Sequence, residues 1–320
     1  FKCFTSMAIV LFCFIGWSSN SWFMIWLMME LVLIMFMGFM ACGCGYKTGE
    51  LMIKYFITQV FISLFMTFLF IVFFFGGTGT MSQVSVFILM SKLGMFPFHG
   101  WMLAILGKVE WWGYYFMSAF LKLIPILLIY YSIDSQNLWF ILVLGGSFGG
   151  VLGLNNLVVQ KLFGYSSIVH LSWILASLLV GTGFFWCYML SYMFMMYYIV
   201  VLCLSVGSYY VNHLKFNSSS FFVKLGFVLM VLSLGGFPPL LGFLFKWIVV
   251  ISECMISDFV ILSMLAGSTL ALFFYLQLVY YFIMIYSLNT KWNKFNLFGT
   301  AGPGLFISLV GVMMIWFIWL

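Results

Sequence analysis

The sequence predicts an all-α polytopic membrane protein with about eleven transmembrane helices in a single domain, residues 1–320. Of the 320 residues, 66% are hydrophobic and only 6% are charged, which is about a quarter of the charge that a soluble domain carries. Apolar runs of roughly 17–25 residues recur along the chain, as membrane-spanning helices require. All 12 basic residues are lysine, so the chain lacks the arginine that favours nucleic-acid binding. We therefore expect membrane lipids, and not nucleic acid, around this chain.

Clusters of Gly, Ser, Asn and Lys separate the apolar runs. The first run is read as a retained span, because no small-residue cleavage site follows it. The absence of a transit peptide agrees with a chain made in the compartment where it works. The predicted spans are 4–17, 22–42, 54–75, 83–106, 111–131, 138–154, 161–180, 184–211, 221–251, 259–286 and 301–320.

The distribution of lysine over the loops agrees with this number of spans. The loops that eleven spans place on the opposite face carry three acids and no lysine: Asp134, Glu253 and Asp258. Lysine-rich loops face the cytoplasm or the mitochondrial matrix, so the N-terminus is expected on that side. The lysines assigned to this face are Lys2, Lys47, Lys54, Lys108, Lys161, Lys215, Lys224, Lys291 and Lys294.

Four charged residues lie inside apolar runs, namely Glu30, Lys92, Lys122 and Lys246. A charge at the centre of a membrane helix opposes insertion by about 2.5–3.5 kcal/mol. A lysine near a helix end can snorkel to the interface, and Glu30 can serve as a structural partner for a lysine. The presence of all four charges favours a path for ions through the membrane.

The pattern L-G-x-F-P occurs twice, at residues 93–97 and at residues 234–238. The two copies lie in the fourth and ninth predicted spans, so they cross the membrane in opposite directions. Paired Gly/Pro-interrupted spans of this kind are typical of the ion sites of transporters with inverted-topology repeats. The sequence therefore predicts an inverted repeat with two broken helices.

Proline beside a buried lysine predicts water inside the membrane. Proline has no N–H group, so it leaves a backbone carbonyl without its helical partner. Pro125 does this to the carbonyl of Leu121, next to Lys122, and Pro97 follows Lys92 by five residues. We expect water bound at these carbonyls to let the lysines take up and release protons.

His170 is a further candidate for proton transfer, because a neutral imidazole can pass a proton between its two nitrogens. The alternative is a packed, hydrogen-bonded histidine, and His99 has the same two interpretations. Gly145, Gly149 and Gly153 recur every four residues, which predicts close helix packing. The seven cysteines lack the spacing of a zinc or iron–sulfur site, so we expect no metal or redox cofactor in this chain.

Six stretches of the sequence read SNSWFMIWLMMELVLI, IKYFITQVFIS, KLGMFPFHGW, LKLIPILLIYY, LNNLVVQKLFGYSSIVHLSWIL and LSLGGFPPLLGFLFKW. These stretches resemble the antiporter-like subunit family of respiratory complex I, the NADH:ubiquinone oxidoreductase. They lie between about residues 19 and 247. The resemblance implies that Glu30 pairs with Lys92, and that Lys122 and Lys246 continue a hydrated proton path. Many relatives have Phe-His-Phe-Trp at positions 98–101 and Pro-Lys-Trp at 245–247, where this chain has FHGW and FKW.

This resemblance implies a proton-translocating subunit in the membrane arm of an H⁺-translocating enzyme of the electron transport chain. It places NADH, FMN, iron–sulfur clusters and ubiquinone in partner subunits, with other antiporter-like subunits as neighbours. It also implies a multi-pass location in the mitochondrial inner membrane, with the N-terminus on the matrix side. Two alternatives stay open, a stand-alone cation/proton antiporter and a structural subunit whose buried charges only pair with each other.

Overall fold

The computed structural model of the chain describes residues 1–43, 46–74, 80–132, 135–207, 209–211, 221–253 and 258–288. These residues form helices and one isolated β-bridge, between Val158 and Tyr210. Six helices within the described part are long and apolar enough to cross a membrane, and shorter apolar helices accompany them. The all-α membrane fold is thus confirmed, and the number of eleven spans stays a prediction.

Several predicted features fall where the structure gives no description. The last predicted span lies outside the described residues, and so do three of the lysines and one of the acids used to orient the loops. These features are the span 301–320, Lys215, Lys291, Lys294 and Asp134, together with the side chains of Lys47 and Glu253.

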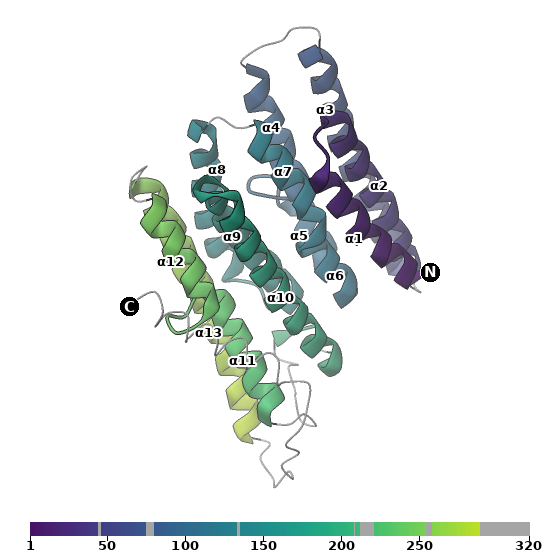
Figure 1. The fold of residues 1–320 in the computed structure, drawn as a ribbon. Coiled ribbons are helices and arrows are strands. Elements are labelled where there is room, and N and C mark those ends of the chain that lie inside the picture. The colour runs from purple at the N-terminus through teal and green to yellow at the C-terminus, as the bar shows by residue number, and fades with distance from the viewer. Residues whose placement is uncertain are drawn as a thin grey trace. The chain divides into compact units, whose positions relative to one another are not determined.

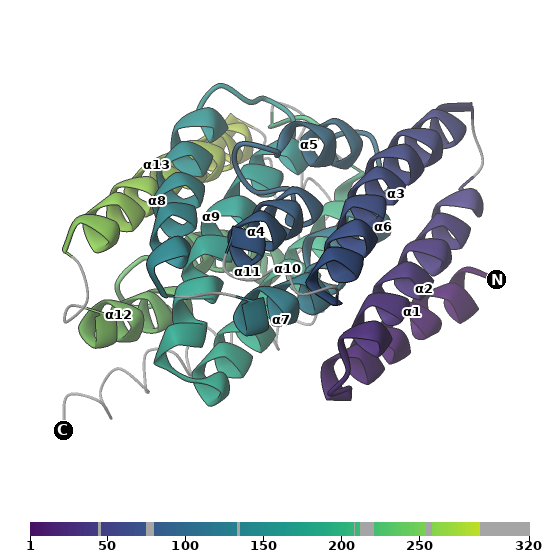
Figure 2. The same cartoon turned by 90° about the horizontal axis from the view of Figure 1, so that it is seen from above.

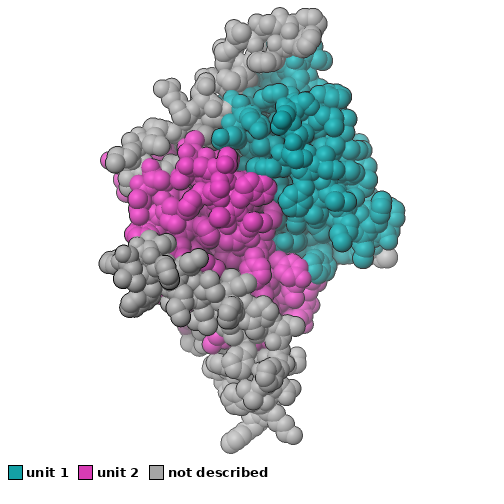
Figure 3. Space-filling view, in the orientation of Figure 1, with its two compact units in different colours: residues 1–141 teal, residues 142–320 magenta. Residues whose placement is uncertain are grey.

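The chain divides into two compact units, Phe1–Ile141 and Leu142–Leu320 (Figure 3). Each unit contains one of the two predicted helix breaks. The single domain over 1–320 and the inverted orientation of the two repeats stay predictions.

Unit 1 is a bundle in which α1 and α2 lie side by side and α7 packs against α1, α2 and α4 (Figures 1 and 2). Residues Leu123 to Ile129 of α7 are all apolar and buried. The elements are α1 (Lys2–Ser18), α2 (Trp22–Ala41), α3 (Tyr46–Phe74), α4 (Thr80–Leu93), α5 (Gly100–Leu106), α6 (Trp111–Ser118), the 3₁₀ turn η1 (Phe120–Lys122) and α7 (Leu123–Ser132).

The third predicted span starts too late, because α3 begins at Tyr46 and the sequence pattern placed its start at residue 54. The charged residues at this end are part of the helix. Glu50 and Lys54 form an ion pair at helical spacing, and such pairs stabilise a helix.

Exposed ion pairs gather the charges of unit 1 at one end. Lys2 lies 2.9 Å from Glu110, and Lys108 lies 3.9 Å from Glu50, which also pairs with Lys54. The structure therefore brings together three of the lysines that the loop pattern assigned to one face. The sequence analysis did not identify their partners Glu50 and Glu110.

Unit 2 is built around α9, which is buried along most of its length and contacts α10, α12 and α13. Lys224, which the sequence analysis placed at the start of the span 221–251 on the lysine-rich face, lies in the first turn of α11 and is buried. The remaining elements are α8 (Ser135–Gly153), α9 (Val159–Val180), α10 (Thr182–Val206), α11 (Phe221–Gly235), α12 (Leu241–Glu253) and α13 (Asp258–Leu288).

The glycines of α8 allow close helix packing, as the sequence predicts. A side chain at Gly149 would meet Val169 of α9, at 2.9 Å, and one at Gly153 would meet Phe274 of α13, at 2.7 Å. Helices α8 and α13 also approach closely where Gly146 of α8 faces Gly267 of α13, because a side chain at Gly267 would collide with the backbone of Gly146. The sequence pattern did not identify Gly267, because its neighbour is distant in the chain.

Candidate functional site

The first helix break lies between α4 and α5, where the sequence predicts it. Gly94 has a φ of +67°, which a glycine adopts without steric cost. The Gly94 N–H donates to the carbonyl of Ser91 (3.2 Å), and the Met95 N–H donates to that of Met90 (3.1 Å). These two bonds form a Schellman cap. The cap ends α4 at Leu93, so Lys92 lies in the last turn of the helix, directly beside the break.

The second break, between α11 and α12, uses the same cap. Gly236 has a φ of +82°, and its N–H donates to the carbonyl of Ser233 (3.1 Å). The Phe237 N–H donates to the carbonyl of Leu232 (3.2 Å). The sequence pattern paired Gly94 with Gly235, and the backbone corrects this by one residue, because the left-handed glycine is Gly236.

Glu30 and Lys92 form an ion pair between α2 and α4. The Lys92 ammonium donates to the Glu30 carboxylate at 3.2 Å, and the side chains of Lys92 and Glu30 are 6% and 23% exposed. The pairing implied by the family resemblance is therefore present. The lysine is the more deeply buried partner, so the carboxylate is the more solvent-accessible member of the pair.

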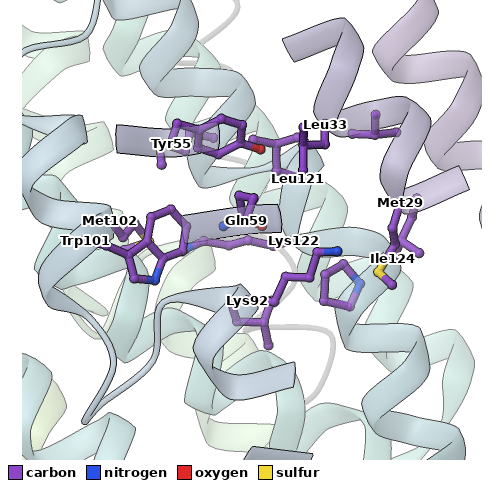
Figure 4. A pocket seen from close by; sticks show the side chains of 14 residues that line it. Met29, Leu33, Tyr55, Gln59, Lys92, Trp101, Met102, Leu121, Lys122 and Ile124 are labelled. Carbon is purple, nitrogen blue, oxygen red and sulfur yellow. The ribbon is translucent and has the colours of Figure 1, made fainter. Parts of the chain in front are cut away.

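Lys92 and Lys122 line the same cavity inside unit 1 (Figure 4). Its volume is about 30 Å³, which is enough for about two water molecules at 10–15 Å³ of probe-occupied volume each. Tyr55, Gln59 and Trp101 add polar atoms to the lining, and the remaining residues are mainly apolar. Both lysines thus reach a space that can hold water.

The backbone is irregular where it positions Lys122. Helix α6 ends at Ser118, the 3₁₀ turn η1 ends at Lys122, and α7 then carries the chain through Pro125. The backbone of the fifth predicted span, 111–131, is therefore irregular next to Lys122, in the region where the sequence predicted that Pro125 disturbs the helix. Helix α7 tolerates Pro125 because this residue lies in its first turn, where N–H groups have no helical partner. The Cys13 thiol of α1 donates to the carbonyl of Phe120 at 3.5 Å.

Lys246 lies on α12, and its buried ammonium group reaches back across the second break. It donates to the carbonyl of Gly235 at 3.1 Å and to that of Leu234 at 3.5 Å. These carbonyls belong to the carboxyl end of α11, which carries a partial negative charge. Gly236 leaves room for the lysine, since a side chain there would begin 2.9 Å from the Lys246 nitrogen.

His170 is buried in unit 2 and contacts two tyrosines of α10. Its Nδ1 lies 3.3 Å from the Tyr188 hydroxyl, and its ring centroid lies 5.2 Å from that of Tyr192. Tyr188 stacks on Phe245, with ring centroids 5.4 Å apart, and Phe245 directly precedes Lys246. The structure therefore connects His170 to the region of Lys246 through one tyrosine and one phenylalanine.

The neighbouring polar residues have local partners. Ser166, Ser167 and Ser172 each donate to the carbonyl three residues earlier in α9. His99 lies just before α5, with its Nδ1 3.2 Å from the carbonyl of Pro97. His213 lies outside the described residues. The serines are thus bonded within their own helix, and a role of His99 in proton transfer stays a prediction.

The structure brings Glu30, Lys92 and Lys122 together in unit 1, and it places His170 and Lys246 in unit 2. Their roles in proton transfer stay predictions. The sequence analysis did not single out Gln59, which is a buried amide on α3. The available signal was an amide side chain inside the predicted membrane span 54–75.

No group of three or more His, Cys, Asp or Glu side chains that could hold a metal ion occurs in the described ranges. Cys13 and Cys203 are buried free thiols, and Cys254 lies outside those ranges. The expected lack of a cofactor in this chain stays a prediction.

Comparisons with known proteins agree on one family. The sequence model described as "NADH:quinone oxidoreductase/Mrp antiporter, TM" matches residues 19–274. The chain is 31% identical to NADH-ubiquinone oxidoreductase chain 2 of Anopheles gambiae, over 93% of this chain and 92% of that one. It is 32% identical to the protein of that name from Myxine glutinosa, over 81% of this chain and 79% of that one.

The fold is also similar to those of solved structures. A chain of respiratory complex I from Thermus thermophilus has a TM-score of 0.79 and 17% identity, over 97% of this chain and 77% of that one. A chain of the Mrp complex from Dietzia sp. has a TM-score of 0.72 and 17% identity, over 88% of this chain and 59% of that one. At such low identity, these two likenesses concern the fold alone.

Proposed function

Because the chain belongs to the NADH:quinone oxidoreductase/Mrp antiporter transmembrane family, we propose that it is a proton-translocating membrane-arm subunit of respiratory NADH:ubiquinone oxidoreductase. The observation that carries the proposal is the Glu30–Lys92 ion pair beside a cavity that Lys122 also lines. Buried ionisable residues in membrane helices mark proton paths in pumps and transporters. The names of the curated relatives support the assignment to this enzyme.

In this proposal, Glu30 controls the proton on Lys92. The carboxylate favours the charged form of the lysine, so movement or neutralisation of Glu30 favours release of the lysine proton. Water in the shared cavity then carries the proton toward Lys122. The pair and the cavity thus have two states, one with the proton on Lys92 and one with the proton released. A pump requires such a pair of states, because its driving force must favour one of them over the other.

Lys246 continues the path in unit 2. Its ammonium group is held by carbonyls at the carboxyl end of α11, and this end favours a cation. His170 is a candidate relay in the same unit. We place all redox cofactors in partner subunits, so the residues of this chain move protons only.

The names of the relatives support the proposed membrane, and the lysine-rich loops support the proposed orientation. The chain is a multi-pass protein of the mitochondrial inner membrane, with its N-terminus and the exposed lysines of unit 1 toward the matrix. Its partners are other membrane-arm subunits, including other antiporter-like subunits, and membrane lipids.

The lysines provide the test. We expect Lys92→Ala and Lys122→Ala to lower NADH-driven proton transport into sealed vesicles, and to lower coupled turnover, while the complex still assembles. Lys54→Ala is the matched control, because Lys54 is exposed and does not line the cavity. Wild-type proton transport in both cavity variants would refute the proposed function.

The fold similarity to a chain of a Mrp complex favours one second candidate, a cation/proton antiporter that works without an NADH-oxidising partner. A native gel of the mildly solubilised protein, stained for NADH oxidation, separates the two candidates. A band in a large NADH-oxidising assembly supports the respiratory subunit. Migration without that activity, together with sodium- or potassium-driven pH changes in liposomes, would support the antiporter.

A further inference from the structure

Gln59 is a buried amide that lines the same cavity as the two lysines of unit 1. It lies on α3, is 4% exposed and shares the cavity wall with Lys92 and Lys122 (Figure 4). Within the described part of the chain, its side chain makes no hydrogen bond or ion pair to another residue. A buried amide without a partner is destabilising, so the position requires a partner that the protein itself does not supply.

Water is the partner that this cavity can hold. The cavity of about 30 Å³ has room for about two water molecules, and a buried water needs two to four polar partners. The lysine ammonium groups can only donate hydrogen bonds. Trp101 also only donates, and its indole N–H is already bonded to the carbonyl of Ser91 at 3.0 Å.

A water molecule between the two lysines therefore needs acceptors for its own hydrogens. The carbonyl oxygen of Gln59 is such an acceptor, and Tyr55 offers the only other side-chain oxygen among the lining residues. A water that donates one hydrogen to Gln59 can accept from the Lys92 ammonium with its oxygen and point its second hydrogen toward the nitrogen of Lys122 when that amine is neutral. The amide thus supplies a hydrogen-bond acceptor, which the lysine ammonium groups lack.

We propose that Gln59 is a positioning residue, which holds and orients the water that passes protons between Lys92 and Lys122. This inference rests on the proposed function. In the transfer step, the Lys92 ammonium gives a proton to the water oxygen, and the water gives one of its protons to the neutral amine of Lys122. Lys92 ends as a neutral amine, Lys122 ends as an ammonium, and the water is regenerated.

The test is Gln59→Met in the assembled complex, with NADH-driven proton transport and thermal unfolding as readouts. We expect proton transport to fall about fivefold, which is the factor for one lost hydrogen bond of about 1 kcal/mol. The unfolding temperature should stay the same or rise, because an amide without a protein partner is replaced by an apolar side chain. The solvent deuterium isotope effect on transport should also increase, which a purely structural role of Gln59 would not cause.

Ser63→Ala is the matched control. Ser63 is buried on the same helix, donates to the carbonyl of Val60 at 2.9 Å and does not line the cavity. We expect this variant to transport protons at the wild-type rate with an unchanged isotope effect.

The outcomes separate the inference from the proposed function. Wild-type transport by Gln59→Met, with impaired transport by Lys92→Ala, overturns the inference and leaves the function in place. Wild-type transport by both lysine variants overturns the function itself. If Gln59→Met does not assemble, Gln59→Leu is measured in the same way, and failure of both to assemble would show that the amide is needed for folding and overturn the inference.

Discussion

Replacement of the glycine at the second helix break, Gly236, should displace Lys246. Replacement Gly236→Ala adds a single methyl group at a position with a φ of +82°. The new carbon would lie 2.9 Å from the Lys246 nitrogen and 3.2 Å from its Cδ. The lysine side chain must therefore shift, and we expect this shift to break the hydrogen bond that its ammonium group now donates to the carbonyl of Gly235.

Two contributions to the free energy follow from this geometry. A left-handed backbone conformation costs an L-residue about 1–2 kcal/mol relative to glycine. Loss of the hydrogen bond from the Lys246 ammonium costs about 1.5–3 kcal/mol. Only the loss of the hydrogen bond concerns the lysine. A loss of about 2 kcal/mol, within that range, corresponds to a factor of about 30 in a rate or population.

The assay compares Gly236→Ala with Gly207→Ala in the assembled complex. Gly207 has a φ of +67°, and a side chain there would meet nothing within 4 Å, so this control carries the backbone strain alone. We expect both variants to unfold at a lower temperature, and only Gly236→Ala to lose NADH-driven proton transport, by about 30-fold. Equal transport by the two variants would refute the reasoning that Gly236 makes room for a working lysine.

Two further predictions concern unit 1 and unit 2 separately. Glu30→Gln removes one partner of a buried ion pair, so we expect a loss of stability of about 1–3 kcal/mol, less than for a fully buried pair, together with lower proton transport. Glu50→Gln affects an exposed ion pair, so it should change stability and proton transport little. Equal losses of stability and transport in the Glu30→Gln and Glu50→Gln variants would contradict this reasoning. Gly267→Leu should destabilise the complex by about 3 kcal/mol or more, because the added side chain collides with the backbone of α8 at Gly146. Gly183→Leu, at an open position, is its control in thermal unfolding, and a stable Gly267→Leu variant would show that α8 and α13 do not pack closely.

The sequence predicts both helix breaks because their cause is local. Proline removes a backbone donor, and glycine permits the left-handed residue of the cap. The pattern was one residue wrong at the second break, where Gly235 and Gly236 are both glycine. Which of two adjacent glycines takes the left-handed conformation depends on packing around the cap.

Other parts of the site depend on contacts between distant segments. Lysine spacing did not show that Lys246 would reach back to α11, because this requires the chain to turn between residues 236 and 241. The start of α3 was misplaced because the charges near Glu50 read as a loop, although their spacing also suits a helix. Gln59 was missed because a single amide has no motif, and its importance appears only when Lys92 and Lys122 are placed around the same cavity.

The burial of α9 has a mechanical consequence for unit 2. The helix has 22 residues, so it is about 33 Å long at 1.5 Å per residue, close to the thickness of a membrane's hydrocarbon core at about 30 Å. Because close-packed interiors are hardly compressible, a helix held on several sides cannot absorb a push by deforming. Packing against α10, α12 and α13 therefore restrains α9 from bending, so the helix keeps the distance between its Val159 and Val180 ends nearly constant.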